Sequence, residues 1–283
     1  MANTHTSGYY FAPPSHWPVV GSLALFLLAI GGVLLMNSHG IGWVPFGAGF
    51  FVLVYMLFGW FGTVIRESEG GLFNKQVDMS FRWAMSWFIF SEVMFFGAFF
   101  GALYYARVYS LPWLGDPDNK LLWPDFAAHW PSAGPYRPPE FSPMHAFGIP
   151  AINTLLLLSS GVTVTWAHWA LKKNDRRNLI FGLSLTIMLG LIFLFLQAFE
   201  YVHAYSELNL KLTSGVFGST FFMLTGFHGF HVTLGVTMLT VILFRCVAGH
   251  FKPDHHFGFE AVSWYWHFVD VVWLLLFVFV YWL

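Results

Sequence analysis

Charged residues are scarce in this sequence: Asp, Glu, Lys and Arg make up 10% of 283 residues, against roughly 25% in soluble domains. The formal net charge of -1 argues against a partner attracted by bulk electrostatics, and so against nucleic-acid binding. The single cysteine, Cys246, excludes a disulfide framework and a multi-cysteine metal or iron–sulfur site. Residues 1–20 lack the basic start of a cleavable signal peptide, so the first apolar segment is expected to remain as a membrane span.

Hydrophobic residues are abundant, at 57% of the chain, and aromatic residues reach 21%. Together with the shortage of charge, they predict an all-α integral membrane protein. Apolar segments predict seven transmembrane helices, at about 19–36, 46–65, 83–108, 146–171, 179–201, 216–246 and 264–283. The longest connection, 109–144, is rich in Pro and Trp and has no periodic apolar run, which predicts an ordered surface loop instead of a separate domain.

The distribution of Lys and Arg predicts the orientation of the helices. The side that holds the N-terminus collects nine of them: Arg66, Lys75, Arg82, Lys172, Lys173, Arg176, Arg177, Arg245 and Lys252. The other side holds four: Arg107, Lys120, Arg137 and Lys211. Because basic residues accumulate in cytoplasmic loops, the N-terminus is expected inside and the C-terminus outside, with the 109–144 loop in the periplasm.

The last span, 264–283, contains two ionisable residues, His267 and Asp270. Twenty residues at about 1.5 Å each cross the roughly 30 Å hydrocarbon layer. Ionisable groups there cost on the order of 3 kcal/mol or more, so this pair must face protein. Residues three apart share a helix face and can bond each other or a common partner. The same spacing joins Glu200 and His203 at the end of the fifth span. For both pairs a local structural ion pair is favoured over a catalytic role.

Glu92 lies midway along the third span, in the segment SEVMFFGAFFGAL. Burial with no cationic neighbour in sequence favours the protonated acid. Two interpretations stay open: a proton carrier, or a neutral carboxyl that hydrogen-bonds a neighbouring helix.

His228 and His231 in the sixth span could share a metal ion, because they lie on one helix face. They cannot bind opposite faces of one haem, and His267 is the only loose candidate for a second haem ligand. The sequence therefore favours no metal or redox cofactor in this chain.

A second group of candidates lies at the inner membrane surface. Trp60, Arg66, Glu67 and Arg245 offer charges at headgroup level and an aromatic face for acyl chains, which favours phospholipid binding over simple interface anchoring. Four histidines are expected on the same side and could collect protons, since histidine titrates near neutral pH. They are His5, His16, His255 and His256.

Several long motifs resemble the cytochrome c oxidase subunit III family. The C-terminal run HHFGFEAVSWYWHFVDVVWLLLFVFVYWL (255–283) carries the resemblance furthest. Other family signatures occur in the family's order: VIRES (64–68), SEVMFF (91–96), SGVTVTWAHWAL (160–171), LQAFEY (196–201) and GSTFFMLTGFHGFHVTLG (218–235). The resemblance covers nearly the whole chain.

The resemblance implies a fold in which a two-helix bundle, residues 1–66, is separated from a five-helix bundle, residues 67–283, by a V-shaped cleft that holds phospholipids. By position, Trp60, Arg66, Glu67 and Arg245 match family lipid contacts. Glu92 matches a carboxylate that reacts with hydrophobic carbodiimides. The chain departs from the family at WFGTVIRES (60–68), where many relatives read WWRDVIRES, so two charges near the cleft are lost.

The resemblance also implies a function. The chain is expected to be a non-catalytic subunit of a proton-pumping terminal oxidase in a bacterial inner membrane. It would stabilise catalytic subunit I and support proton uptake and lipid or oxygen access. Haem and copper would lie in partner subunits, and the cofactors of this chain would be structural phospholipids. The alternatives are the equivalent subunit of a quinol oxidase, or a stand-alone proton-coupled transporter in which Glu92, Glu200 and Asp270 form a relay.

Overall fold

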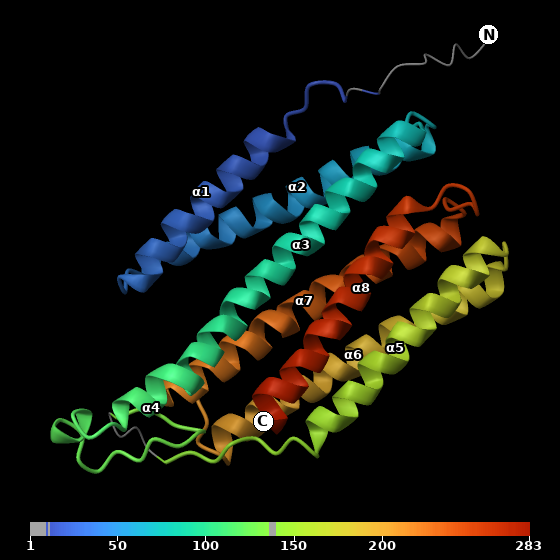
Figure 1. Ribbon diagram of the computed structural model, residues 1–283. Helices are drawn as coiled ribbons and strands as arrows, with labels where there is room; N and C mark the ends of the chain where they lie inside the picture. The colour runs from blue at the N-terminus through green and yellow to red at the C-terminus, as the bar shows by residue number, and fades with distance from the viewer. Residues whose placement is uncertain (1–9, 11, 136–139) are drawn as a thin grey trace, which may run out of the picture. The chain divides into compact units, whose positions relative to one another are not determined.

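The computed structural model describes residues 10, 12–135 and 140–283 (Figure 1). Within these ranges the regular elements are helices, apart from an isolated bridge between Lys252 and His255. Among the described residues, seven helices are long and apolar enough to cross a membrane, which confirms the predicted all-helical membrane fold. The chain divides into two compact units, Met1–Phe81 and Arg82–Leu283. The predicted domain boundary at residue 66 stays a prediction.

The first unit contains α1 (Trp17–Met36) and α2 (Trp43–Glu69), joined through a short 3-10 turn at Gly40–Gly42. Small residues allow the two helices to approach closely. A Cβ atom added at Gly49 would lie 2.7 Å from the backbone nitrogen of Leu28. Contacts of this kind hold membrane helices together, because lipid is as apolar as the side chains and van der Waals packing must supply the attraction.

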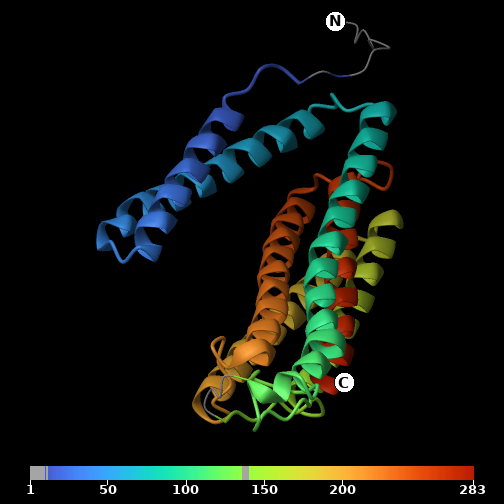
Figure 2. The same cartoon turned by 60° about the vertical axis from the view of Figure 1, so that its left-hand side comes forward.

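The second unit contains most of α3 and all the following helices. They are α3 (Lys75–Tyr105), a π-helical turn (Ala106–Ser110), α4 (Leu111–Leu114), a 3-10 turn (Asn119–Leu121), α5 (Ile149–Lys172), α6 (Arg176–Ser206), α7 (Gly215–Ala248), α8 (Phe257–Leu276) and a final π-helical turn (Phe277–Trp282). Helix α5 packs along α6, α6 on α7, α7 on α8, and α8 on α5 (Figures 1 and 2). Helix α8 therefore contacts both α5 and α7.

Trp266 on α8 occupies the centre of this bundle and is 1% exposed. Its indole lies against Gly190 of α6 and Gly235 of α7, where an added Cβ would come within 2.8 Å and 2.7 Å of ring carbons. The indole Nε1–H donates to Ser160 Oγ of α5 at 2.9 Å. One side chain thus joins four helices, and its polar atom is satisfied inside the core.

Asp175 caps the start of α6 in the tight turn after α5. Its carboxylate accepts the backbone N–H of Asn178 at 3.1 Å and the Asn178 side-chain amide at 2.6 Å. These donors hold the pKa of Asp175 below its usual range. The cap satisfies a backbone donor that the first turn of a helix leaves free.

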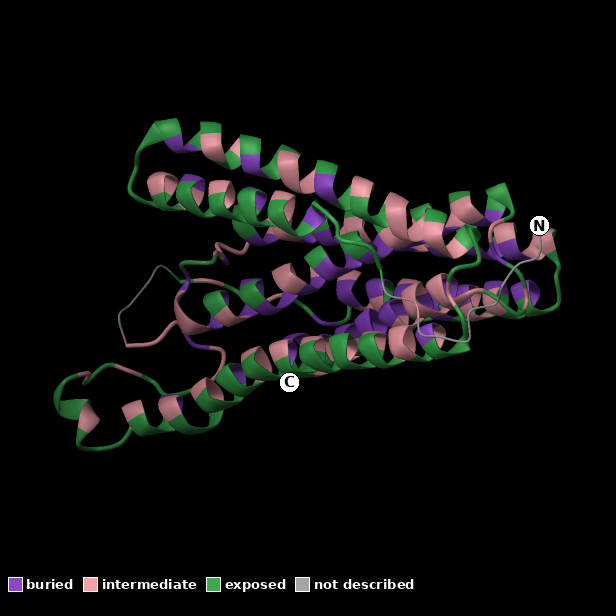
Figure 3. Ribbon diagram, turned by 90° about the horizontal axis from the view of Figure 1, so that it is seen from above, coloured by how far each residue is buried: buried purple, intermediate pink, exposed green. Residues whose placement is uncertain are grey.

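Large apolar side chains cover much of the outer surface of the helices, for example Phe51, Phe58, Phe195 and Phe244. In Figure 3, α1 and α2 consist mostly of exposed and intermediate residues, with few buried ones. Exposing so much apolar surface to water would be unfavourable, so hydrocarbon or another apolar subunit is expected to cover it. The last span is the most buried of the seven.

Several helices extend beyond the predicted spans. Helix α2 runs from Trp43 to Glu69 and α8 begins at Phe257, seven residues before the predicted start at 264. Hydropathy detects only the part of a helix that lies in hydrocarbon, and polar residues such as Glu260 continue the helix toward the headgroups. The described parts of the 109–144 loop contain only short helical turns. The predicted orientation of the termini stays a prediction.

Candidate functional site

Glu92 on α3 meets His231 on α7. His231 Nε2 lies 2.9 Å from Glu92 Oε2, and the two side chains are 10% and 20% exposed. The imidazole sits among aromatic rings, with Phe96 at 5.0 Å between centroids and Tyr265 stacked at 6.3 Å. The Glu92 side chain therefore has a cationic or hydrogen-bonding partner that its own stretch of sequence does not supply.

The other nitrogen of His231 fixes how many protons this pair shares. His231 Nδ1 lies 2.7 Å from the carbonyl oxygen of Phe227. A carbonyl only accepts, so Nδ1 carries a hydrogen. Nε2 is then either a neutral acceptor of a carboxyl proton from Glu92, or an imidazolium donor to the Glu92 carboxylate. Both arrangements place one proton between the two side chains. We call Glu92 of α3 and His231 of α7 the proton-sharing pair.

His228 and His231 have separate partners although they lie three residues apart. His228 Nε2 lies 3.1 Å from the Val269 carbonyl oxygen of α8, and the ring packs against Phe193 and Trp273. His231 turns to Glu92 instead. The two imidazoles therefore do not converge on a common ligand, and His228 serves the contact between α7 and α8.

Glu200 and His203 do not form the predicted local pair. Glu200 is fully buried and its Oε1 accepts the Tyr281 hydroxyl at 2.7 Å. His203 Nδ1 lies 3.2 Å from Glu207 Oε2, one turn further along the chain. Residues three apart are offset by only about 60° around the helix, yet here Glu200 faces the core and the side chain of His203 is 36% exposed. The acid is a core group that ties α6 to the final π-helical turn, Phe277–Trp282.

His267 and Asp270 face α5 without bonding each other. His267 Nε2 lies 3.2 Å from Thr165 Oγ1, while Asp270 Oδ1 is buried without a hydrogen-bond partner. Both side chains lie over Gly161, where an added Cβ would come within 2.9 Å of Asp270 Oδ2. They line a groove together with aromatic side chains of α5, including Trp166 and Trp169. The predicted direct ion pair is absent, and His267 bonds across helices instead.

The predicted lipid-binding residues fall in both units. Trp60 is 49% exposed, and Arg66 bonds its own helix through the Gly62 carbonyl at 3.2 Å and Thr63 Oγ1 at 3.3 Å. Glu67 interacts with Tyr10, whose pKa is raised first by desolvation and then by this carboxylate. Arg245 of the second unit lies over the Phe251 ring at 4.3 Å. The charged groups are held in place by local contacts.

The predicted proton-collecting histidines have different surroundings. His5 lies outside the described residues, and His255 is exposed. His16 packs its ring against Trp17 at 4.3 Å. His256 contacts His168 of α5 and Glu260 of α8, at 3.2 Å and 3.3 Å between polar atoms. His168 and Glu260 were not among the candidates, although the spacing of His256 and Glu260 by four residues signals a shared helix face.

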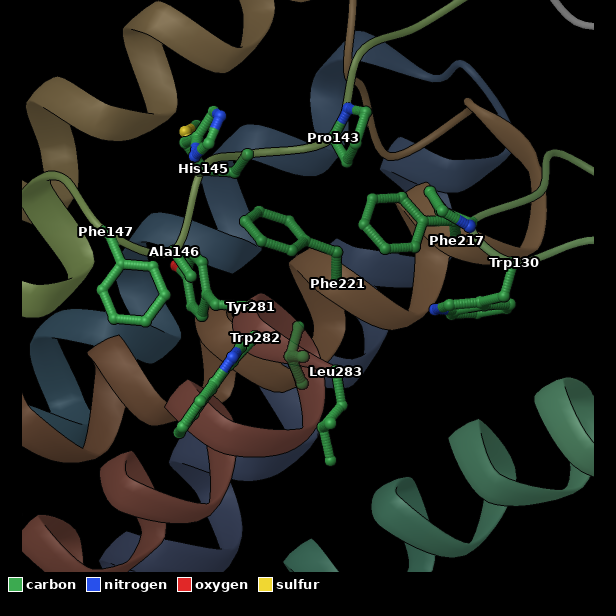
Figure 4. Close-up of a pocket in the computed structure, with 13 residues that line it drawn as sticks. Trp130, Pro143, His145, Ala146, Phe147, Phe217, Phe221, Tyr281, Trp282 and Leu283 are labelled. Carbon is green, nitrogen blue, oxygen red and sulfur yellow. The ribbon is translucent and has the colours of Figure 1, made fainter.

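A separate pocket lies where the final π-helical turn meets the start of α7 and the loop before α5. Figure 4 shows that it is lined largely by aromatic rings, among them Trp130, Phe217 and Tyr281. None of the sequence-predicted site residues lines it. One lining residue, Tyr281, donates a hydrogen bond to the buried Glu200.

Comparison with known proteins gives a consistent result. Residues 7–283 match the family described as Cytochrome c oxidase subunit III. The chain is 41% identical over 275 residues to cytochrome c oxidase subunit 3 of Papio hamadryas, covering 97% of this chain and 96% of the relative. It is 42% identical over 275 residues to the protein of that name from Oncorhynchus mykiss, with the same coverage. With the Loxodonta africana protein it shares 40% over 281 residues, covering 99% and 98%.

Proposed function

Because the chain belongs to the cytochrome c oxidase subunit III family, we propose that it packs against the haem–copper catalytic subunit and stabilises that subunit during turnover. It is a non-catalytic subunit of cytochrome c oxidase, an oxidoreductase complex. The observation that carries the proposal is the family match over residues 7–283. Exposed apolar faces support it, because they offer a surface that partner subunits or lipid would cover. Deletion of the chain from the oxidase tests the proposal.

We propose a bacterial plasma membrane as the location of this multi-pass protein, with the N-terminus inside. The excess of Lys and Arg on that side, nine against four, supports the orientation. The 109–144 loop would then face the periplasm, where it is placed to contact another oxidase subunit. Haem and copper would lie in the partner subunits.

The inner-surface residues support a proposal that this subunit binds structural phospholipids. Arg66 offers an exposed guanidinium near the end of α2, and Trp60 presents a half-exposed indole six residues earlier. A guanidinium suits a phosphate and an indole suits the boundary between headgroup and acyl chain. Arg245 would serve a second headgroup at the corresponding end of α7.

The proton-sharing pair of Glu92 and His231 is the group best suited to support proton uptake. It lies within two spans, is enclosed by aromatic rings, and can hold one proton in either of two positions. Transfer between those positions needs no movement of the helices. Glu200 is a weaker candidate, because its bond to Tyr281 lies in the closed core.

A hydrophobic carbodiimide is expected to label Glu92, because this reagent enters lipid and attacks protonated carboxyls. The variant Glu92→Gln should lose this labelling entirely, while Glu207→Gln, which removes an acid whose side chain is 69% exposed, should leave it unchanged. His231→Gln should increase the rate of labelling, since it removes the imidazole that can take the proton from the Glu92 carboxyl. Mass spectrometry of the peptide containing residue 92 measures all three. Unchanged labelling in Glu92→Gln would refute the assignment.

A further inference from the structure

Three potential metal ligands converge where α5 ends and α8 begins. They are His168 in the last turns of α5, His256 just before α8, and Glu260 in the first turn of α8. The side chains of these residues are 19%, 9% and 12% exposed. The cluster is thus mostly enclosed but open enough for an ion to enter from water. The sequence does not predict it, because His168 and His256 are 88 residues apart.

The distances between the three ligand atoms match a tetrahedral metal site. His168 Nε2 and His256 Nε2 are 3.2 Å apart, His256 Nε2 and Glu260 Oε1 are 3.3 Å apart, and His168 Nε2 and Glu260 Oε1 are 3.6 Å apart. Zinc bonds of about 2.0 to 2.1 Å in a tetrahedron put neighbouring ligand atoms about 3.4 Å apart. All three atoms could contact one ion at its usual bond length.

The second nitrogen of His256 orients its ring for this role. His256 Nδ1 lies 3.1 Å from the Lys252 carbonyl oxygen, so it carries the hydrogen. In the neutral ring, the Nε2 lone pair then points toward His168 and Glu260. Metal-binding histidines commonly donate their other N–H to a carbonyl or carboxylate in this way.

Hydrogen bonds alone cannot satisfy the three ligand atoms of this cluster as well as a metal ion would. A single hydrogen on His168 Nε2 must be shared between His256 Nε2 and Glu260 Oε1, and a second would place an imidazolium close to another imidazole. A divalent cation accepts all three lone pairs at once. Arg82 of α3 forms an ion pair with Glu260 through Oε2, which leaves Oε1 directed at the histidines. Arg82 also carries a like charge, which lowers the affinity for a cation without blocking the site.

We propose that His168, His256 and Glu260 bind a divalent cation, for which two imidazoles and one carboxylate best match Zn²⁺, with a water molecule as the fourth ligand. The ion would join the end of α5 to the start of α8. Through the ion pair between Glu260 and Arg82 it would also be linked to α3. In this position the ion would act as a structural link between helices. The ion competes with protons for the imidazole nitrogens, so its affinity should rise with pH.

Radioactive zinc tests the proposal in the complete purified oxidase after washing with a chelator. Equilibrium dialysis should show that the double variant His168→Gln, His256→Gln binds one Zn²⁺ fewer per complex, or binds it roughly 100-fold more weakly, since loss of even an outer partner costs 10- to 100-fold. The matched control is His255→Gln, which removes an exposed histidine of the same loop and should leave binding unchanged. Equal zinc stoichiometry and affinity in the double variant and the wild type would overturn the proposal.

The wild-type oxidase provides an independent measurement that needs no variant to assemble. Diffraction data collected at the zinc absorption edge from zinc-soaked crystals should show anomalous density between the three side chains. Saturating zinc without such density would mean that the cluster only shares a proton, and the proposed metal site would be wrong.

Discussion

Deletion of this subunit is expected to leave an oxidase whose haem absorption is intact but whose activity decays during turnover. Its removal would expose the surface of the catalytic subunit that it covers and take away the proton-sharing pair of Glu92 and His231. We expect inactivation to accelerate by roughly tenfold or more, which corresponds to about 1.4 kcal/mol in the barrier. Oxygen consumption followed over successive turnovers, together with a haem spectrum before and after, measures this.

Adding the wild-type gene back provides the control and should restore the lifetime of activity. Adding back Glu92→Gln separates the role of covering the catalytic subunit from the role of the Glu92 and His231 pair. This variant keeps the packing surface and removes the shared proton. A deletion strain whose oxidase keeps its activity for as many turnovers as the wild type would refute the proposed stabilising function.

Trp266→Ala is expected to produce the largest loss of stability in the second unit. The change empties the space between Gly190 and Gly235 and removes the bond to Ser160. Large-to-small substitutions of buried aromatic residues cost about 3 to 5 kcal/mol. Lipid does not offset this loss, since packing is the main attraction between membrane helices. The midpoint of denaturation of the detergent-purified oxidase should therefore fall, with early release of this subunit.

A tryptophan on the exposed surface of α5 gives the matched control. Trp169 is 61% exposed, so Trp169→Ala removes the same side chain from a surface position and should change the midpoint little. The intermediate variant Ser160→Ala leaves the buried indole N–H unpaired and should cost about 1 to 3 kcal/mol. Equal midpoints for Trp266→Ala and Trp169→Ala would contradict the central position assigned to Trp266.

The spans could be predicted from the sequence because hydrocarbon imposes a length and a composition on every helix that crosses it. Their ends could not, since helix formation continues past the apolar segment wherever backbone hydrogen bonds and local contacts allow it. Helix α8 shows this most clearly: it starts at Phe257 with Glu260 in its first turn, where hydropathy carries no signal.

The ionisable candidates were also detectable, because a charge in an apolar span is costly enough to be informative. Their partners were not. Glu92 meets His231 from 139 residues away, and Glu200 meets Tyr281 from 81 residues away. Spacing along one helix favoured local pairs such as Glu200 with His203, but the close packing of neighbouring helices supplied stronger partners. Contacts between helices depend on how each helix is rotated and packed against its neighbours. A single sequence carries no local pattern from which these contacts can be predicted.

The absorption spectrum of the material that co-purifies with this chain tests the central claim most directly. A tag on the chain, membrane extraction in a mild detergent and a single affinity step should yield a complex with haem absorption, because the proposed partner carries the redox centres. The ratio of haem to tagged chain should be fixed and should survive a second purification step. A chain that isolates intact and folded without haem would contradict the assignment to an oxidase and would favour a stand-alone transporter.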